Sequence, residues 1–268
     1  MAPGEKDARV PVPERCYLVC SNAWSGSTML CRTLSDVGTA GRPQEYFLTW
    51  PQPLPHEDGF WENGRLAREH GVSSRDEFLS LVYRLGSTPN SVFGAKLLWR
   101  YVPLALGSFR EMPRFAGMTD AEIFWAAFPG LKVIHLTRRD RLRQAVSWHR
   151  AVEDGVWWQY NSTTAPPSAQ PEYQFEVIAE MVRLIAEGER SWRALYATLG
   201  ITPFEVAYED LVTDEGYHAA VRGILGHLEL DDRVVIPRPR TQRQADDISE
   251  AWVERFFADV AALAKPLP

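Results

Sequence analysis

The sequence predicts an α/β protein of three layers, in which a central, mostly parallel sheet is covered by helices on both faces. Short apolar runs typical of buried strands alternate along the chain with longer segments whose apolar residues recur at helical spacing. The first apolar run leads through a short turn directly into a helix, which is the order of a strand–helix–strand unit with parallel strands.

Four segments are predicted strands because each is short, apolar and bounded by turn residues. The first, residues 16–20, places Cys16 and Cys20 on one face. Three clustered cysteines do not form a disulfide framework, so we expect small buried side chains there. The other predicted strands are 92–98, 131–137 and 204–208.

Helical spacing of apolar residues predicts the helices. The helix 27–37 ends at Gly38, and the helix 74–85 begins with the Ser74/Glu77 pair of a capping box. The remaining predicted helices are 120–128, 141–158, 173–199, 214–227 and 248–264.

We expect residues 1–268 to form a single domain with a flexible N-terminal segment at 1–14. Proline, glycine and small polar residues predict irregular excursions, which we expect to shape a binding pocket. These excursions are 38–63, 103–118 and 155–171.

Composition excludes some classes of protein. A net charge of −6 argues against a general nucleic-acid binder, although arginines gather between Arg138 and Arg150. No apolar stretch resembles a secretory signal or reaches the roughly 20 residues that span a bilayer, which predicts a cytoplasmic protein. The chain has no HExxH motif or Cys/His cluster, so we expect no metal.

The most informative segment is the predicted strand-to-helix turn, Ser21–Thr28 (SNAWSGST). Backbone N–H groups at the start of a helix favour an anion, and Gly26 permits close approach of a phosphate. The turn is not a Walker loop, because Ser27 stands where that motif requires lysine. A kinase or ATPase would lack its usual contact with the β- and γ-phosphates.

Together with this loop, four further segments resemble the bacterial trehalose 2-sulfotransferase family in their order along the chain. They are GRPQEYF (41–47), HLTRRD with QAVSW (135–140 and 144–148), YEDL (208–211) and RQAD (243–246). The resemblance covers about residues 16–256. It implies a P-loop NTPase-like sulfotransferase fold, 3′-phosphoadenylyl sulfate (PAPS) as donor, adenosine 3′,5′-bisphosphate (PAP) as product, and a homodimer.

The resemblance also implies roles for particular residues. Arg138 and Ser147 would bind the 3′-phosphate, with Arg139 as an alternative to Arg138, because a guanidinium and a hydroxyl suit a dianion. Tyr208 would lie near the adenine, and Arg243 would close over the 3′-phosphate. The residues that would hold the 5′-phosphosulfate are Ser25, Gly26, Ser27 and Thr28, and Trp24 is a further cofactor-binding candidate in the same loop.

Glu45 is the candidate general base, since the acceptor hydroxyl must lose a proton as it attacks sulfur. The family resemblance places the base at this glutamate. His56, His70 and His149 are rival bases.

Trp24 departs from the family pattern, because sulfotransferases usually carry lysine or arginine at this position. A cation there would stabilise charge on the departing phosphate, which a neutral indole cannot do. Lys96, near the end of a predicted strand, is the candidate replacement. Alternatively, Trp24 lines the acceptor pocket.

Three functions follow as hypotheses. The first is a sulfotransferase that acts on a sugar, glycolipid or secondary-metabolite hydroxyl. The second is a P-loop kinase, which the missing lysine disfavours. The third is a catalytically weak nucleotide-binding or scaffold protein, which only Trp24 supports.

Overall fold

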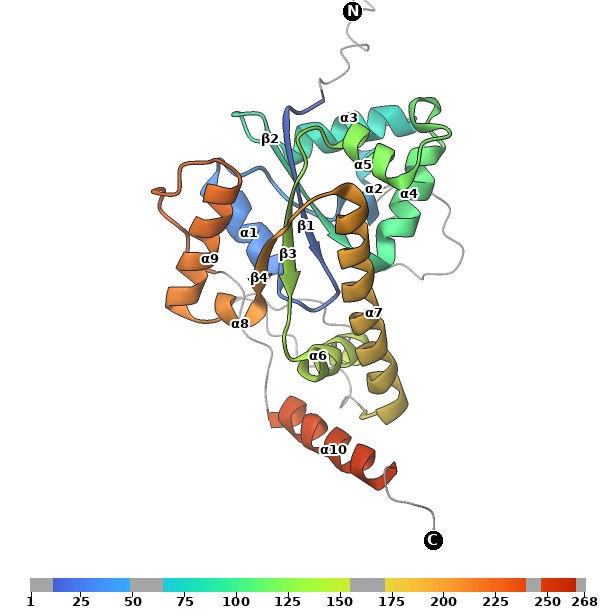
Figure 1. Ribbon diagram of the computed structural model, residues 1–268, viewed down its shortest axis with the longest axis vertical. Coiled ribbons are helices and arrows are strands. Elements are labelled where there is room, and N and C mark those ends of the chain that lie inside the picture. The colour runs from blue at the N-terminus through green and yellow to red at the C-terminus, as the bar shows by residue number, and fades with distance from the viewer. Residues whose placement is uncertain (1–11, 49–64, 155–171, 240–246, 264–268) are drawn as a thin grey trace, which may run out of the picture.

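The computed structural model describes residues 12–48, 65–154, 172–239 and 247–263. Its centre is a four-stranded sheet in the order β2–β1–β3–β4, and every neighbouring pair is parallel (Figure 1). The strands are β1 (Arg15–Ser21), β2 (Val92–Leu98), β3 (Lys132–Thr137) and β4 (Phe204–Ala207). The predicted parallel α/β architecture is therefore confirmed.

Alternation along β1 divides the core into two. Cys16, Leu18 and Cys20 pack into one apolar cluster, whereas Tyr17 and Val19 pack into another. Because successive side chains of a strand point to opposite faces, each cluster lies on its own face of the sheet. Both faces must be covered, which explains the continuous burial of this strand.

The face that carries Val19 is covered by α1 (Ser27–Val37) and α9 (Asp214–His227). The opposite face is covered by α3 (Arg75–Gly86), α4 (Val102–Arg110) and α5 (Asp120–Ala127), together with the C-terminal half of α7. Figure 1 shows the two groups of helices on either side of the strands.

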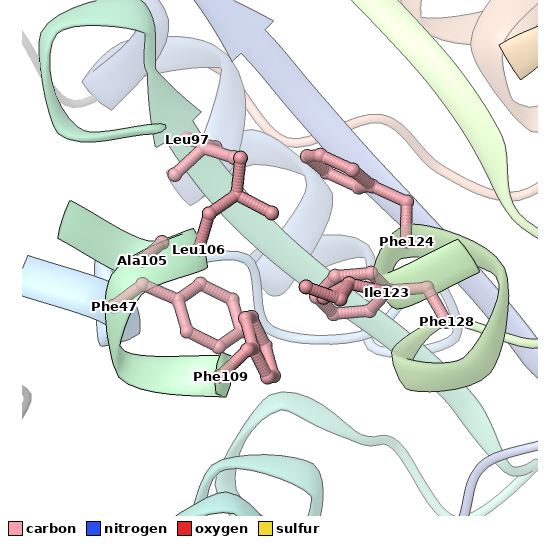
Figure 2. A pocket seen from close by; sticks show the side chains of 8 residues that line it. All are labelled: Phe47, Leu97, Ala105, Leu106, Phe109, Ile123, Phe124 and Phe128. Carbon is pink, nitrogen blue, oxygen red and sulfur yellow. The ribbon is translucent and has the colours of Figure 1, made fainter. Parts of the chain in front are cut away.

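A small apolar pocket lies within this second group. Figure 2 shows that its lining includes Phe47, Leu97 of β2 and aromatic rings from α4 and α5. Such a lining offers no hydrogen bond to a polar ligand, so the pocket belongs to the core. The eight lining residues are Phe47, Leu97, Ala105, Leu106, Phe109, Ile123, Phe124 and Phe128.

The 25-residue helix α7 (Phe175–Leu199) joins this core to a third cluster. Trp192 and its C-terminal neighbours pack beneath the sheet, while Ile178 and Ile185 pack on α6 (Arg141–Asp154) and α10 (Asp247–Leu263). A helix of this length, about 37 Å, can serve both clusters.

The prediction that residues 103–118 form an irregular segment is wrong. Residues Val102–Arg110 form α4, and Pro113–Phe115 form a short 3-10 helix, η3. Pro103 fits the first turn of a helix, where its missing N–H has no intrahelical partner to lose. Val102, Leu106 and Phe109 recur at helical spacing and are buried.

Other predictions differ from the structure mainly at element ends. The helix predicted at 141–158 is described as far as Asp154, and 155–171 lies outside the described residues. β4 ends at Ala207, so Tyr208 begins the one-turn helix α8 (Tyr208–Leu211). Unpredicted short elements are α2 (Arg65–Glu69), η1 (Tyr46–Leu48) and η2 (Trp99–Tyr101).

The order in which the strands are added to the sheet reverses beside β1. The chain goes from β1 to β2 on one side and later crosses to β3 on the other side. In open parallel sheets, ligands bind at the carboxyl edge next to such a reversal. In Figure 1 the carboxyl ends of β1 and β3 point to the same edge, near α6 and α8.

The buried His135 makes stability depend on pH. It is 1% exposed, and its ring meets Tyr196 edge-to-face. Burial, with a smaller contribution from the charge of Arg193, lowers the pKa of His135 to about 4. The unfolded chain therefore binds a proton that the folded chain excludes, and stability falls as pH drops from 6.5 toward 4, by up to about 3 kcal/mol.

We expect His135→Phe to reduce this pH dependence, measured as urea midpoints at pH 7 and pH 4.5. Some slope remains because burial also lowers the pKa of His227. The exposed His218 provides the control, since His218→Gln should keep the wild-type slope. An unchanged slope in His135→Phe would contradict the assignment.

Candidate active site

The loop after β1 has the geometry of an anion site. Gly26 precedes α1 in a left-handed conformation (φ 86°), and no side chain caps this end of the helix. The N–H groups of Met29 and Leu30 both bond back to the Gly26 carbonyl. These two amides are therefore used within the helix, and the start of α1 presents its positive dipole end and the amides that precede Met29 to the carboxyl edge of the sheet.

Hydrogen bonds from distant helices hold this loop in place. The indole N–H of Trp192 donates to the Ser21 carbonyl (3.1 Å), and Gln144 donates to the Ala23 carbonyl (2.6 Å). The side chain of Asn22 donates to the backbone of α7 (3.0 Å), close against Gly188. Such preorganisation lowers the cost of binding an anion, since the loop is already ordered.

Tyr208 lies directly over Gly26. A Cβ atom on Gly26 would lie 2.6 Å from the tyrosine ring, so only glycine fits beneath it. The guanidinium of Arg138 lies over the same ring, 4.5 Å from its centroid. Arg138 is only 8% exposed, and it donates to the Ser147 hydroxyl (3.4 Å). The structure thus brings together Gly26, Tyr208, Arg138 and Ser147 from four parts of the chain.

Arg139 points elsewhere. Its guanidinium forms a two-pronged ion pair with Asp210 (3.0 and 3.2 Å), and its backbone N–H donates to Glu209. Its side chain is 64% exposed. Of the two candidate arginines, Arg138 is the one that contacts Ser147.

Lys96 connects the loop to the candidate base. Its ammonium group donates to the Thr28 hydroxyl (3.2 Å) and forms an ion pair with Glu45. The lysine side chain is 8% exposed and that of Glu45 is 19% exposed. Lys96 of β2 pairs in register with Val19 of β1, two residues before the strand ends. The pairing of the strands therefore positions the ammonium group near the loop.

Glu45 retains one unused oxygen. Its Oε1 binds Lys96, whereas its buried Oε2 has no hydrogen-bond partner among the described residues. A buried carboxylate oxygen without a donor is costly, so it marks a place where a bound hydroxyl can donate.

The remaining candidates are less well placed. His70 is exposed, and His149 is buried in α6, where its ring bonds to the Glu172 carbonyl (3.0 Å). His56 and Arg243 lie outside the described residues.

Within the described part of the chain, no group of three His, Cys, Asp or Glu side chains is arranged to hold a metal. None of its helices is long and apolar enough to cross a bilayer.

Two contacts were not predicted from the sequence. The ring of Trp24 stacks on that of Trp148 (5.8 Å between centroids, 8° between planes), and Tyr208 packs on Gly26. Both join segments more than 100 residues apart. The only available signal was that Trp148 directly follows the candidate Ser147.

A parallel sheet with a glycine-containing loop after its first strand and buried cations around that loop is the arrangement of α/β proteins whose sites suit phosphorylated ligands. More specifically, the chain belongs to the Stf0 sulphotransferase family, whose model matches residues 16–259, and it is a sulfotransferase.

Related proteins support this assignment. The chain is 31% identical to a trehalose 2-sulfotransferase from Mycolicibacterium smegmatis, over 94% of this chain and 97% of that protein. It is also 31% identical to one from Mycobacterium tuberculosis, over 94% and 98%. A crystal structure of a sulfotransferase from Alicyclobacillus acidocaldarius shares the fold, with a TM-score of 0.52 at 17% identity and 95% coverage of both chains.

The contact between Gly26 and Tyr208 can be tested against a matched glycine. Gly26 and Gly38 both have left-handed φ angles, but nothing lies within 4 Å of a Cβ built on Gly38. We expect Gly38→Ala to cost about 1–2 kcal/mol of stability from backbone strain alone. Gly26→Ala should cost more, because its methyl group also displaces Tyr208.

The comparison is made by denaturant unfolding of both variants. Adding Tyr208→Ala to Gly26→Ala should remove the extra loss, which a double-mutant cycle measures. Equal losses in Gly26→Ala and Gly38→Ala would show that the tyrosine does not constrain the loop.

Proposed function

We propose that the protein transfers the sulfuryl group of PAPS to a hydroxyl group, with Glu45 as the general base. The acceptor oxygen attacks sulfur while the bond from sulfur to the 5′-phosphate oxygen breaks and leaves its electron pair on that oxygen. The hydroxyl proton passes to Glu45, and the products are a sulfate ester and PAP. The step requires no oxidant or metal.

The observation that carries this proposal is the bridge that Lys96 makes between Thr28 and Glu45. It fixes a candidate base next to a loop built for an anion. General acid–base catalysis requires such proximity, because the base must lie within hydrogen-bond reach of the proton it takes. The unpartnered Oε2 of Glu45 supplies the accepting atom.

The remaining residues fit a nucleotide with phosphates at both ends. The first turn of α1 and the hydroxyl groups of Ser27 and Thr28 suit the 5′-phosphosulfate. Arg138 and Ser147 suit the 3′-phosphate, since a buried guanidinium beside a hydroxyl offers charge and several donors. Tyr208 lies between these two positions. Arg139 remains the alternative ligand for the 3′-phosphate if its pair with Asp210 opens on binding.

The names of the relatives favour a small carbohydrate as acceptor, because both act on trehalose. Another natural product with a hydroxyl group fits the same chemistry. The family resemblance also favours a homodimer, which sedimentation of the purified protein would test.

The proposed donor is tested by incubating the protein separately with PAPS and with ATP and Mg²⁺. We expect PAP and PAPS to raise the melting temperature and ATP to have little effect. Sulfate transfer is then followed over a panel of hydroxylated acceptors that begins with trehalose. Stabilisation by ATP with phosphate transfer would replace the proposal with a kinase. Tight PAP binding without turnover on any acceptor would favour a scaffold role.

We expect Glu45→Gln to cut turnover about 10²–10⁴-fold while PAP affinity remains near the wild-type value. The amide oxygen can still accept from Lys96, but it cannot take the proton. Turnover and isothermal titration with PAP measure the two effects. Glu205→Gln on the exposed side of β4 is the control and should be fully active. Wild-type turnover in Glu45→Gln would rule out this residue as the base.

A further inference from the structure

Trp24 is held in an unusual conformation within the anion loop. Its φ angle is 58°, a left-handed value that costs a bulky residue about 1–2 kcal/mol. Strain of this kind is retained where the surrounding structure requires it. Here it accompanies the parallel stack of the Trp24 ring on Trp148 of α6.

The same tryptophan supports a cation. The guanidinium of Arg100 lies 5.8 Å from the ring centroid of Trp148 and 4.9 Å from that of its neighbour Tyr101. Arg100 belongs to η2, directly after the carboxyl end of β2, and Leu98 at that end pairs with Ser21 at the end of β1. Arg100 and Trp24 therefore leave adjacent strands at the same edge and meet the same ring.

The charges around the loop make this arginine distinctive. Lys96, the cation in contact with the loop, is balanced by Glu45. Two exposed arginines that follow the carboxyl end of β3 are paired with acids, Arg139 with Asp210 and Arg141 with Glu189. Arg100 is exposed and forms no ion pair with any carboxylate in the described ranges. Stacking leaves its N–H edge available, because those donors lie in the guanidinium plane.

We infer that Arg100 is a catalytic residue that stabilises the negative charge developing on the 5′-phosphate oxygen as the bond to sulfur breaks. This inference rests on the proposed function. It assigns to Arg100 the role that the neutral Trp24 cannot perform, with the guanidinium held by Tyr101 and by Trp148, the ring on which Trp24 of the loop stacks. A fixed cation at the point where charge develops is worth about 10²–10³-fold in turnover.

The inference predicts that Arg100 contacts the 5′-phosphate and not the 3′-phosphate, which binding measurements with two nucleotides can test. In Arg100→Gln, affinity for PAP should fall about tenfold, because a charge-assisted contact to the 5′-phosphate is lost. Affinity for adenosine 3′-phosphate, which lacks that group, should not change. Turnover should fall about 10²-fold, with little change in the acceptor KM. Arg100→Lys should lose less, since it keeps the charge.

A rescue experiment tests the role directly. Adding Trp24→Lys to Arg100→Gln returns a cation to the loop, so turnover should recover at least about tenfold over the single variant. Arg233→Gln, which changes an exposed arginine outside the site, should match the wild type. Melting temperatures of all variants exclude loss of folding as the cause.

Two results would overturn the inference. If Arg100→Gln raises only the acceptor KM, the arginine binds an anionic group on the acceptor. If it changes neither PAP affinity nor turnover, it has no role in the reaction. Failure of the wild-type protein to bind PAP would instead reject the proposed function itself.

Discussion

The site depends on one buried ammonium group. Lys96 is nearly excluded from water, and an unpaired buried charge would cost several kcal/mol, so its partners are structural requirements. Those partners come from two separate segments, the start of α1 through Thr28 and the irregular stretch before η1 through Glu45. Satisfying the ammonium therefore fixes the anion loop and the carboxylate relative to each other.

The sheet makes this possible. Lys96 pairs in register with Val19, so its side chain leaves β2 on the face that α1 covers. Its neighbour Leu97 points to the other face and lines the apolar pocket with Phe47, two residues beyond Glu45 (Figure 2). Packing on one face and an ion pair on the other thus hold the same short segment. Strand β2 thus contributes to both the core and the site, because its successive side chains point to opposite faces of the sheet.

Local patterns in the sequence predict where helices and strands lie, but they do not predict which of these elements touch. The helix 27–37 and the strand 92–98 have the predicted bounds, since periodicity and a terminal glycine are local signals. The helix in 103–118 was missed because its prolines and glycine outweighed an apolar spacing that was present. The packing of Tyr208 on Gly26 joins residues 182 apart and leaves no local trace. Lys96 was proposed from its strand position, but its ion pair with Glu45 needed the structure.

The ion pair also gives the proposed chemistry a consistent charge balance. Before transfer, Lys96 and Glu45 together carry no net charge, which suits a partly buried position. When Glu45 takes the acceptor proton, the pair gains one positive charge while negative charge develops on the departing phosphate oxygen. Lys96 already contacts Thr28 at the loop, so this charge appears next to where it is needed. The carboxylate would then act twice, as the proton acceptor and as the group whose neutralisation frees Lys96 to assist Arg100 at the leaving phosphate.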